Sequence, residues 1–302
     1  MITSFGEILK KAKSLGKKTI SVACAEDIEV LNSIEQARKE GLVKGILIGD
    51  KKVITEIAIK NEINPANYEI VDEPDKTNSA RLSVALVRNK KADILMKGMV
   101  DTAILLKAVL DKEIGLRTDR ILSHIYMMKI NGYSRFLIST DGTMIIQPNL
   151  IQKAQIIQNA IDFCHYLEIE NPKVAVLAAI ELVNPDMPAT IDAACLSKMS
   201  ERGQIKGGTV EGPLAFDNAI SKEAALHKKI SSLVSGEVDI VLSPCIEAAN
   251  IFSKSMVFLG QAIPAGIVLG AKAPIVLVSR SDSAESKLYS IALGVLASEE
   301  KK

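Results

Sequence analysis

Short, continuously apolar runs rich in β-branched residues recur along the chain, and segments with helical periodicity separate them. Such runs are typical of parallel strands covered by helices on both faces, because a strand with one solvated face alternates apolar and polar residues. The pattern begins again after Asn171-Pro172, a turn signal in front of a new apolar run. The runs predict strands over 19–24, 45–49, 93–96, 135–140, 173–179, 239–243, 266–269 and 274–279. We therefore predict an α/β fold with largely parallel sheets.

Amphipathic spacing predicts helices between these strands, most clearly over 28–40, 78–89, 149–167 and 283–297. The chain has 302 residues, 48% of them hydrophobic, which is more apolar material than one compact core usually holds. We expect two α/β domains, the first formed by residues 1–130 plus 280–302 and the second by residues 131–279. Ligands of parallel sheets bind at the carboxyl ends of strands, and a cleft between the two domains is the expected active site.

The charge balance argues against several classes of partner. Lys and Arg number 37 and Asp and Glu 36, so the net charge of +1 provides no overall field for nucleic acid or an anionic membrane. Aromatic residues make up 4% of the chain, which leaves few stacking platforms for bases. No apolar run approaches the ~18 residues of a membrane span. With four cysteines far apart in sequence and no signal-peptide pattern, we expect a cytoplasmic protein with reduced thiols.

Ser279 and Arg280 end the last predicted strand, immediately before a helix. Backbone N–H groups at a helix N-terminus, a guanidinium and hydroxyls together suit a phosphate or a developing oxyanion. An equally good interpretation is structural: Asp282 and Glu285 have the spacing of a capping box, and Arg280 then belongs to a surface ion pair. Local sequence alone does not separate the two.

A second cation-and-glycine pair, Lys97-Gly98, follows the predicted strand 93–96. Gly98 would let a ligand approach the backbone closely, and Lys97 offers a point charge. Further along, Lys107, Arg117 and Arg120 have few acidic neighbours and would suit a multiply charged anion. Solvated side chains at helix ends explain these cations nearly as well.

The segment 206–219 is rich in glycine and proline, including Gly207, Gly208, Gly212 and Pro213, and predicts a shaped loop. Such a loop either wraps a nucleotide or pantetheine arm or simply connects a strand to a helix. Its spacing is not that of a P-loop, and no Gly-x-Gly-x-x-Gly follows the first strand, so nucleotide hydrolysis and dinucleotide redox chemistry are disfavoured.

The histidines and cysteines indicate no metal site. His124, His165 and His227 are far apart and lack zinc-ligand spacing. His124 follows Ser123 within an apolar run, where a histidine is either catalytic or a structural hydrogen-bonding residue. Cys24 and Cys245 follow apolar runs and are candidate nucleophiles, although neither has an activating histidine beside it in sequence.

With these residues in view, the chain resembles the phosphate acetyl/butyryl transferase family, and more closely its phosphate butyryltransferase branch. The segments that carry the resemblance span nearly the whole chain: 92–98, 115–118, 122–124, 170–175, 183–188, 198–207, 211–215 and 279–283. The resemblance implies two domains related to the isocitrate and isopropylmalate dehydrogenase fold, an active site in the interdomain cleft and a homo-oligomer. It implies no metal or redox cofactor, with CoA and phosphate as substrates.

The implied reaction is butyryl-CoA plus phosphate giving butyryl phosphate plus CoA, a reversible step of butanoate metabolism linked to an acyl (butyrate) kinase. In this reading Arg280 binds the phosphate, Ser279 steadies the intermediate, and a general base takes the thiol proton. The base of the acetyl branch aligns with Ser286, so we expect Asp282, or else Glu285, to serve instead. The candidate phosphate- and CoA-binding residues are Lys97, Gly98, Lys107, Arg117, Ser123, His124, Gly207, Gly208, Gly212 and Pro213.

Other functions stay open at this point. Within the family, the alternative is phosphate acetyltransferase or another acyl specificity, because acyl groups differ by methylenes worth only ~1–3 kcal/mol each in an apolar pocket. On the related fold, a metal- and NAD-dependent decarboxylating dehydrogenase would need metal-binding aspartates that the sequence does not present convincingly. A non-catalytic CoA-binding protein would bind CoA without phosphate-dependent loss of the thioester.

Overall fold

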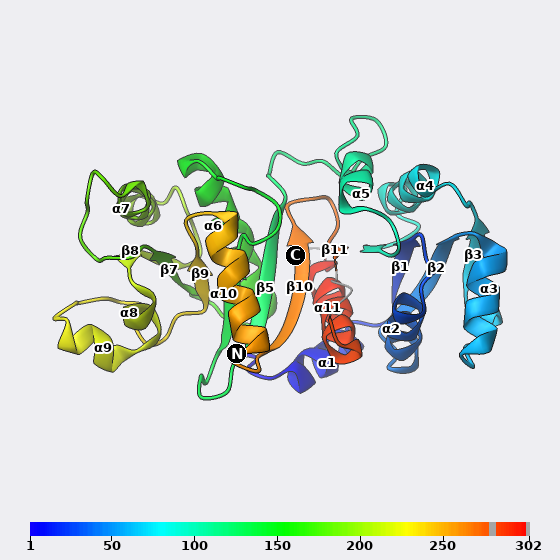
Figure 1. Ribbon diagram of the computed structural model, residues 1–302, viewed down its shortest axis with the longest axis horizontal. Helices are drawn as coiled ribbons and strands as arrows, with labels where there is room; N and C mark the ends of the chain where they lie inside the picture. Colours follow the sequence, from blue (N-terminus) through cyan, green and yellow to red (C-terminus); the bar gives the residue numbers. More distant parts are fainter. Residues whose placement is uncertain (278–281, 300–302) are drawn as a thin grey trace. The chain divides into compact units, whose positions relative to one another are not determined.

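The computed structural model describes residues 1–277 and 282–299 (Figure 1). Internal contacts divide the chain into two compact units: unit 1 comprises Met1–Ser4 and Ile121–Pro264, and unit 2 comprises Phe5–Arg120 and Ala265–Lys302. Each unit combines helices with a largely parallel set of strands, so the predicted fold class is confirmed. The chain changes unit after residues 4, 120 and 264, whereas the sequence led us to expect domain boundaries after residues 130 and 279.

The strands of unit 2 follow the order β3-β2-β1-β4-β11-β10. All neighbouring pairs are parallel except β10 with β11, where Val268 lies opposite Ile275 in an antiparallel pair. The prediction that residues 266–269 form a parallel strand is therefore wrong, because a short turn joins the two strands and reverses the chain. The strands are β1 (Lys18–Ala23), β2 (Val43–Gly49), β3 (Glu69–Asp72), β4 (Ile94–Lys97), β10 (Ile263–Leu269) and β11 (Ile275–Val276).

Helices cover both faces of the unit 2 sheet. Ile20, Gly45 and Ile94 are in register on one face. A Cβ on Gly45 would lie 3.1 Å from the Ile34 side chain of α2, and a Cβ on Gly294 of α11 would lie 3.3 Å from the Ile94 side chain. Helices α2 and α11 therefore pack against that face. The steps from β1 to β2 and from β3 to β4 run in opposite directions, so right-handed crossovers place α4 on the other face. The helices are α1 (Phe5–Ser14), α2 (Ile28–Lys39), α3 (Lys51–Lys60), α4 (Lys76–Arg88), α5 (Thr102–Val109) and α11 (Ala284–Ala297), with a 3₁₀ turn at Pro65–Asn67.

Side-chain caps fix where several of these helices begin. Asp27, Asp50 and Asp75 accept backbone N–H groups at the starts of α2, α3 and α4. Each carboxylate satisfies N–H groups that a helix leaves without intrahelical partners. Segments from opposite ends of the chain then meet, because α1 and α11 lie side by side (Figure 1). The Phe5 and Tyr289 rings stack there with centroids 4.1 Å apart.

The strands of unit 1 follow the order β5-β6-β9-β7-β8, and all neighbouring pairs are parallel except β5 with β6. The strands are β5 (Ser123–Lys129), β6 (Phe136–Thr140), β7 (Lys173–Leu177), β8 (Thr209–Leu214) and β9 (Ile240–Leu242). The helices are α6 (Leu150–Tyr166), α7 (Pro188–Glu201), α8 (Phe216–Ile220), α9 (Lys222–His227) and α10 (Ile246–Phe258).

Strand β8 corrects the prediction of one loop over 206–219. Gly212 and Pro213 are tolerated in this strand because β8 forms the edge of the unit 1 sheet, where a missing N–H breaks no ladder. A Cβ on Gly212 would lie 2.7 Å from Val176 O and 3.1 Å from the Ala193 side chain. The glycine therefore allows β8 to pack closely between β7 and α7.

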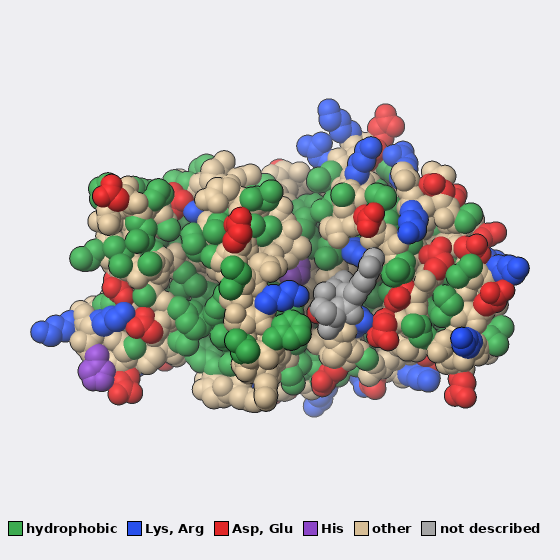
Figure 2. Space-filling model, viewed as in Figure 1, with side chains coloured by type: hydrophobic (Ala, Val, Ile, Leu, Met, Phe, Trp, Pro, Cys, Tyr) green, Lys and Arg blue, Asp and Glu red, His purple; other side chains and the backbone are tan. Residues whose placement is uncertain are grey.

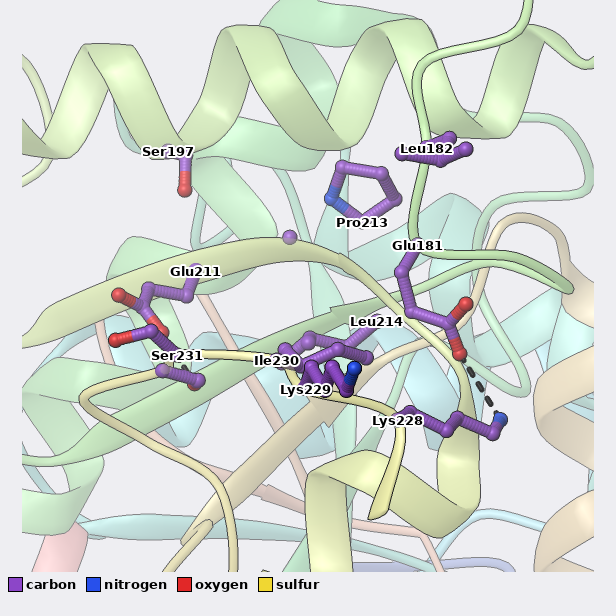
Figure 3. Close-up of a pocket in the computed structure, with 12 residues that line it drawn as sticks. Glu181, Leu182, Ser197, Glu211, Pro213, Leu214, Lys228, Lys229, Ile230 and Ser231 are labelled. Atoms are coloured by element: carbon purple, nitrogen blue, oxygen red, sulfur yellow. Dashed lines mark hydrogen bonds and ion pairs between the residues drawn. The ribbon is translucent and has the colours of Figure 1, made fainter. Parts of the chain in front are cut away.

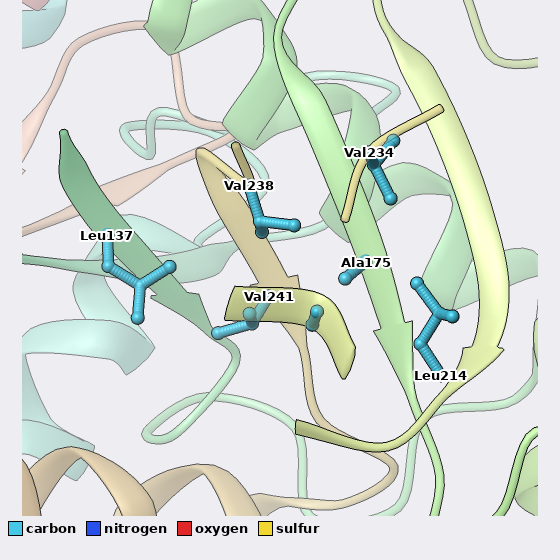
Figure 4. Close-up of a cluster of buried hydrophobic side chains, with 7 residues drawn as sticks. Leu137, Ala175, Leu214, Val234, Val238 and Val241 are labelled. Atoms are coloured by element: carbon cyan, nitrogen blue, oxygen red, sulfur yellow. The ribbon is translucent and has the colours of Figure 1, made fainter. Parts of the chain in front are cut away.

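The core of unit 1 includes a cluster of buried side chains from strands β6, β7, β8 and β9 and the segments next to them (Figure 4). Phe216 of α8 and Phe252 of α10 pack against this cluster with their rings edge to face, 4.8 Å apart. Burial of this apolar surface at about 25 cal/mol per Å² is the main force that holds α8 and α10 on the sheet. The buried members are Leu137, Ala175, Leu214, Ala219, Val234, Val238 and Val241.

Candidate active site

The carboxyl ends of β1, β4 and β11 lie next to one another in unit 2. Ala23 is in register with Lys97, and Met96 is in register with Val276. The strand order also changes direction between β1 and β4. Parallel α/β sheets bind ligands at such switch points, just beyond the strand ends. We call this region, which also holds the first turns of α2 and α11, the carboxyl edge of unit 2.

Gly98 has a backbone role at this edge. Its N–H donates to Ala23 O at 2.8 Å, and the Met99 N–H donates to Cys24 O at 2.7 Å. A Cβ on residue 98 would lie 2.1 Å from Cys24 O, far inside contact distance. The close approach that requires a glycine here is therefore made by the chain's own strand β1. Lys97 is partly buried, and its ammonium donates to Gly98 O at 3.2 Å.

Lys107 and Arg117 do not lie beside Lys97. Lys107 is exposed in the last turn of α5. Arg117 is also exposed, and its neighbours Leu116 and Thr118 are both hydrogen-bonded to the segment before β11. Leu116 O accepts the Lys272 N–H at 2.8 Å, and the Thr118 hydroxyl donates to Gly270 O at 2.6 Å. Residues 270–274 precede β11, so Arg117 lies toward the amino ends of the parallel strands, opposite to the carboxyl edge.

The start of α11 carries the predicted catalytic turn, of which Ser279 and Arg280 lie outside the described residues. The helix is capped by Ser283, whose hydroxyl accepts the Ser286 N–H at 3.1 Å and lies 3.0 Å from the Ser286 hydroxyl. The capping box considered for Asp282 and Glu285 is therefore wrong, because the N-cap is one residue later. Asp282 is partly buried beside this cap.

Glu285 is directed along α11 toward Tyr289. The Tyr289 hydroxyl donates to Glu285 Oε1 at 2.6 Å. Burial, together with this hydrogen bond, raises the pKa of Tyr289 to about 12. One oxygen of Glu285 therefore accepts a hydrogen bond from Tyr289, whose ring stacks on Phe5 of α1.

Two residues that the sequence analysis did not single out face each other at the same edge. Lys287, 2% exposed in α11, donates from its ammonium to Glu29 Oε2 in the first turn of α2 at 3.2 Å. The partners are 258 positions apart, so no local motif announces them. The sequence feature that could have identified Lys287 is its position between Ser286 and Leu288, which are both buried in α11.

In unit 1, Ser123 and His124 begin β5 beside the carboxyl end of β6. The Thr140 hydroxyl donates to His124 O at 2.9 Å, and Asn159 Nδ2 donates to the Ser123 hydroxyl at 2.9 Å. His124 is 5% exposed, and burial lowers its pKa to about 4. Its imidazole is therefore neutral near pH 7 and supplies no positive charge to a phosphate.

Asp141 was missed, although it follows β6 directly and precedes a glycine, the signal that identified Lys97. It is 4% exposed, and its Oδ1 accepts the N–H groups of Thr143 and Met144 at 3.0 Å each. Burial raises the pKa of this carboxyl, and the backbone N–H groups oppose the shift. The side chain organises the loop that follows β6.

The four predicted Gly/Pro residues of segment 206–219 lie at two places. Gly207 and Gly208 precede β8, where the His165 ring donates to Gly207 O at 2.9 Å. Gly207 has φ +78°, and a side chain there would also meet the His165 ring. Gly212 and Pro213 lie farther along β8.

Gly212 and Pro213 line a pocket of about 540 Å³ in unit 1 (Figure 3). Lys228 at its rim bonds Glu181 at 3.1 Å and Asp217 at 2.9 Å. Its ammonium is therefore already balanced by two carboxylates. This pocket lies beside β8, the edge strand of the unit 1 sheet.

Cys24 has none of the features of a reactive thiol. It is buried at φ +54°, and burial raises its pKa, which keeps the thiol protonated. Cys245 is partly exposed at the N-cap of α10. Within residues 1–277 and 282–299, no group of His, Cys, Asp and Glu side chains is arranged to hold a metal ion, and no helix is long and apolar enough to cross a membrane.

Comparison with known proteins places this chain in a family. The model of the family described as "Phosphate acetyl/butaryl transferase" matches residues 75–295. The chain is 46% identical over 296 residues to a phosphate butyryltransferase of Clostridium acetobutylicum, with 98% of each chain covered. It is 43% identical to a phosphate acetyltransferase of Thermotoga maritima, with 96% of this chain and 98% of that one covered.

Solved structures agree with the sequence comparisons. A branched-chain phosphotransacylase from Enterococcus faecalis is 32% identical with a TM-score of 0.83, covering 94% of this chain and all of that one. A 4-hydroxythreonine-4-phosphate dehydrogenase from Klebsiella pneumoniae, at 15% identity, TM-score 0.55 and the same two coverages, shares the fold alone, which supports the dehydrogenase-like architecture. The chain therefore belongs to the phosphate acetyl/butyryl transferase family.

Proposed function

We propose that this chain is a phosphate butyryltransferase, an acyltransferase that moves a short acyl group reversibly between CoA and inorganic phosphate. The observation that carries the proposal is the near full-length identity of 46% with a phosphate butyryltransferase, combined with the family match over residues 75–295. The alternative within the family is an acetyl or branched-chain substrate, since relatives with those names match almost as completely.

The proposed mechanism is a direct transfer in a ternary complex. In the direction of acyl-CoA synthesis, a base removes the thiol proton of CoA, the thiolate forms a C–S bond to the acyl carbon, and the C–O bond to phosphate breaks. Holding both substrates together supplies much of the rate enhancement, because a bimolecular step becomes effectively unimolecular. The electron pair of the broken bond leaves on phosphate, which needs a cation nearby.

We assign these tasks to the turn before α11 on the basis of the family resemblance. Arg280 is the phosphate-binding cation, Ser279 donates to the developing oxyanion, and Asp282 is the base. The position of α11 supports the assignment, because its first turn follows β11 at the carboxyl edge of unit 2.

Asp282→Asn tests the base directly. It should lower kcat in the synthesis direction by at least about 100-fold, since general-base catalysis contributes about 10²–10⁴. Glu285→Gln is the matched control and should keep most of the activity. Normal turnover by Asp282→Asn with normal CoA affinity would remove Asp282 from this role.

The remaining predicted contacts are proposed as binding residues for phosphate or CoA. Lys97 is at the carboxyl edge, whereas Lys107 and Arg117 lie toward the opposite edge of unit 2. We therefore expect Lys97 to affect the KM of one substrate, and Lys107 and Arg117 to affect the KM of the other. Alanine substitution at each position, with separate KM values for phosphate and acyl-CoA, tests this separation. Equal effects of all three on one substrate would contradict it.

The acyl specificity is tested by measuring phosphate-dependent CoA release across acetyl-, butyryl-, valeryl- and branched acyl-CoA. We expect the highest kcat/KM with butyryl-CoA. A clear maximum with acetyl-CoA would support the alternative within the family. Formation of NADH from a hydroxy acid with a divalent metal, without CoA release, would instead support the dehydrogenase alternative.

We also propose that the chain forms a homo-oligomer through unit 1. Exposed apolar side chains gather on α10 and beside its start, where Ile146, Ile251, Phe258 and Leu259 are each at least 64% exposed. Figure 2 shows fewer charged side chains over unit 1 than over unit 2 on the face drawn. Patches of this kind usually mark protein interfaces. Light scattering of Phe258→Glu beside wild type tests the proposal, and a wild-type monomer at micromolar concentration would refute it.

In the cell, the proposed product is an acyl phosphate, so an acyl (butyrate) kinase is the expected functional partner in the cytoplasm. The kinase would transfer the phosphoryl group to ADP. A coupled assay with a purified butyrate kinase should form ATP from butyryl-CoA, phosphate and ADP. ATP formation without added phosphate would contradict this link.

A further inference from the structure

Lys287 is a buried cation at the carboxyl edge of unit 2. Its side chain is 3% exposed, and its ammonium donates to Glu29 Oε2 at 3.2 Å. The Glu29 side chain is 54% exposed. One partner of this ion pair is thus fixed in the protein interior, whereas the other can turn toward solvent.

The position of Lys287 is unfavourable for stability alone. It is the fourth residue of α11, near the positive end of the helix dipole, where anions are favoured over cations. Removing an ammonium from water is costly, and a partner that is half in water offsets only part of that cost. The buried residues of α11 near it carry no charge, and they include Ser286, Leu288 and Ile291. A lysine kept under these conditions is more readily explained by a charge-dependent task.

The pair lies where the proposed phosphate site needs positive charge. Glu29 is in the first turn of α2, which follows the carboxyl end of β1, and Lys287 is in the first turns of α11, which follows β11. Strand β4 lies between β1 and β11 and ends in Lys97. Lys287 and Lys97 therefore bring two positive charges to one edge, and Glu29 balances the buried one.

We propose that Lys287 provides positive charge for the binding of inorganic phosphate, and that Glu29 neutralises this charge while no anion is bound. The proposal rests on the proposed phosphate acyltransferase function and deepens it. In the low-dielectric surroundings of a buried ammonium, the attraction acts over several ångströms, so no direct hydrogen bond is required. Lys287 is accordingly a positioning residue for the anion, and Glu29 is a competitor of the anion.

The two partners must then have opposite effects, which is the decisive property of the proposal. Lys287→Met keeps the length and apolar stem of the side chain but removes the charge, and should raise the KM for phosphate about tenfold. Glu29→Gln leaves the lysine without its competing carboxylate and should lower the KM for phosphate. If the ion pair were merely structural, both variants would be less stable. The KM for phosphate would then not rise in one variant and fall in the other.

The experiment measures KM for phosphate and for butyryl-CoA in wild type, Lys287→Met and Glu29→Gln, together with calorimetric titration of each protein with inorganic phosphate. Lys18→Met is the matched control. Lys18 pairs with Glu299 at the other end of α11, at the amino end of β1, and the control should leave the KM for phosphate unchanged. Lys287→Arg should retain most of the wild-type phosphate affinity.

Changes of the same sign in both variants would overturn the proposal, and so would an effect confined to the KM for butyryl-CoA, which would point to the phosphates of CoA. Wild type without any phosphate-dependent CoA release would refute the proposed function instead. In that case the calorimetric titration still tests the role of Lys287, because it requires no turnover. Unchanged phosphate affinity in Lys287→Met would overturn the proposal that Lys287 provides positive charge for phosphate.

Discussion

Gly98 provides the sharpest structural test of the carboxyl edge. In Gly98→Ala the new methyl carbon would lie 2.1 Å from Cys24 O and 2.6 Å from Ala23 O. Both neighbours are backbone atoms at the end of β1, so no side-chain rotation relieves the overlap. To reach even the shortest acceptable separation of 3.0 Å, the end of β4 must move about 0.9 Å away from β1.

That movement acts on stability and on the site together. The hydrogen bonds from Gly98 N–H and Met99 N–H, now 2.8 and 2.7 Å long, would be stretched beyond useful length. Overpacking costs about 1–3 kcal/mol, and each weakened hydrogen bond about 0.5–1.5 kcal/mol. We expect the free energy of unfolding to fall by roughly 2–6 kcal/mol. Activity should also fall at temperatures where the variant is still folded, because Lys97 moves with Gly98.

Denaturant unfolding followed by circular dichroism, with the CoA-release assay on the same samples, measures both effects. Gly6→Ala is the matched control, because a Cβ on Gly6 meets nothing within 4 Å and alanine favours the helix. The reasoning is refuted if Gly98→Ala is as stable and active as Gly6→Ala.

Two further predictions concern unit 1. The pKa of His124 is held near 4 by burial, below its ordinary value of 6.5, so the folded state binds fewer protons than the unfolded state. This contribution to stability is complete above pH 6.5 and is lost as the pH falls toward 4, by on the order of 3 kcal/mol. Unfolding free energies between pH 7.5 and 4.5 should show the loss, and a His124→Gln variant with an equally steep profile would contradict it. Asp141→Ala removes the acceptor of two backbone N–H groups and should cost about 1–3 kcal/mol of unfolding free energy. Hydrogen exchange should then be faster at Thr143 and Met144, and unchanged protection there would disprove the role of Asp141 in this loop.

Strands with continuous apolar runs were predictable because burial on both faces leaves a strong pattern. β1, β2 and β6 coincide with the predictions to within two residues at each end. Strand β3 has its end residues exposed and lacks such a run, and it was not recognised. Strand β8 was mistaken for a loop because Gly212 and Pro213 usually interrupt strands, and only its edge position makes them acceptable.

The candidate site was predictable to the extent that strand ends reveal it. Lys97 was found from its position after an apolar run, and the same rule would have identified Asp141. Tertiary partners were not accessible in this way. The packing that brings Glu29 to Lys287 depends on α2 and α11 sharing one face of the sheet, and the direction of Glu285 depends on Tyr289 stacking on α1.

The central claim is that this chain transfers an acyl group from CoA to inorganic phosphate. The most direct measurement incubates wild type and Arg280→Ala with butyryl-CoA and phosphate, quantifying free CoA and butyryl phosphate by mass spectrometry. We predict one butyryl phosphate for each CoA released by wild type, none without phosphate, and a rate about 10²–10³ lower for a stably folded Arg280→Ala. Release of CoA by wild type without formation of an acyl phosphate, or no release with any acyl-CoA, would contradict the claim.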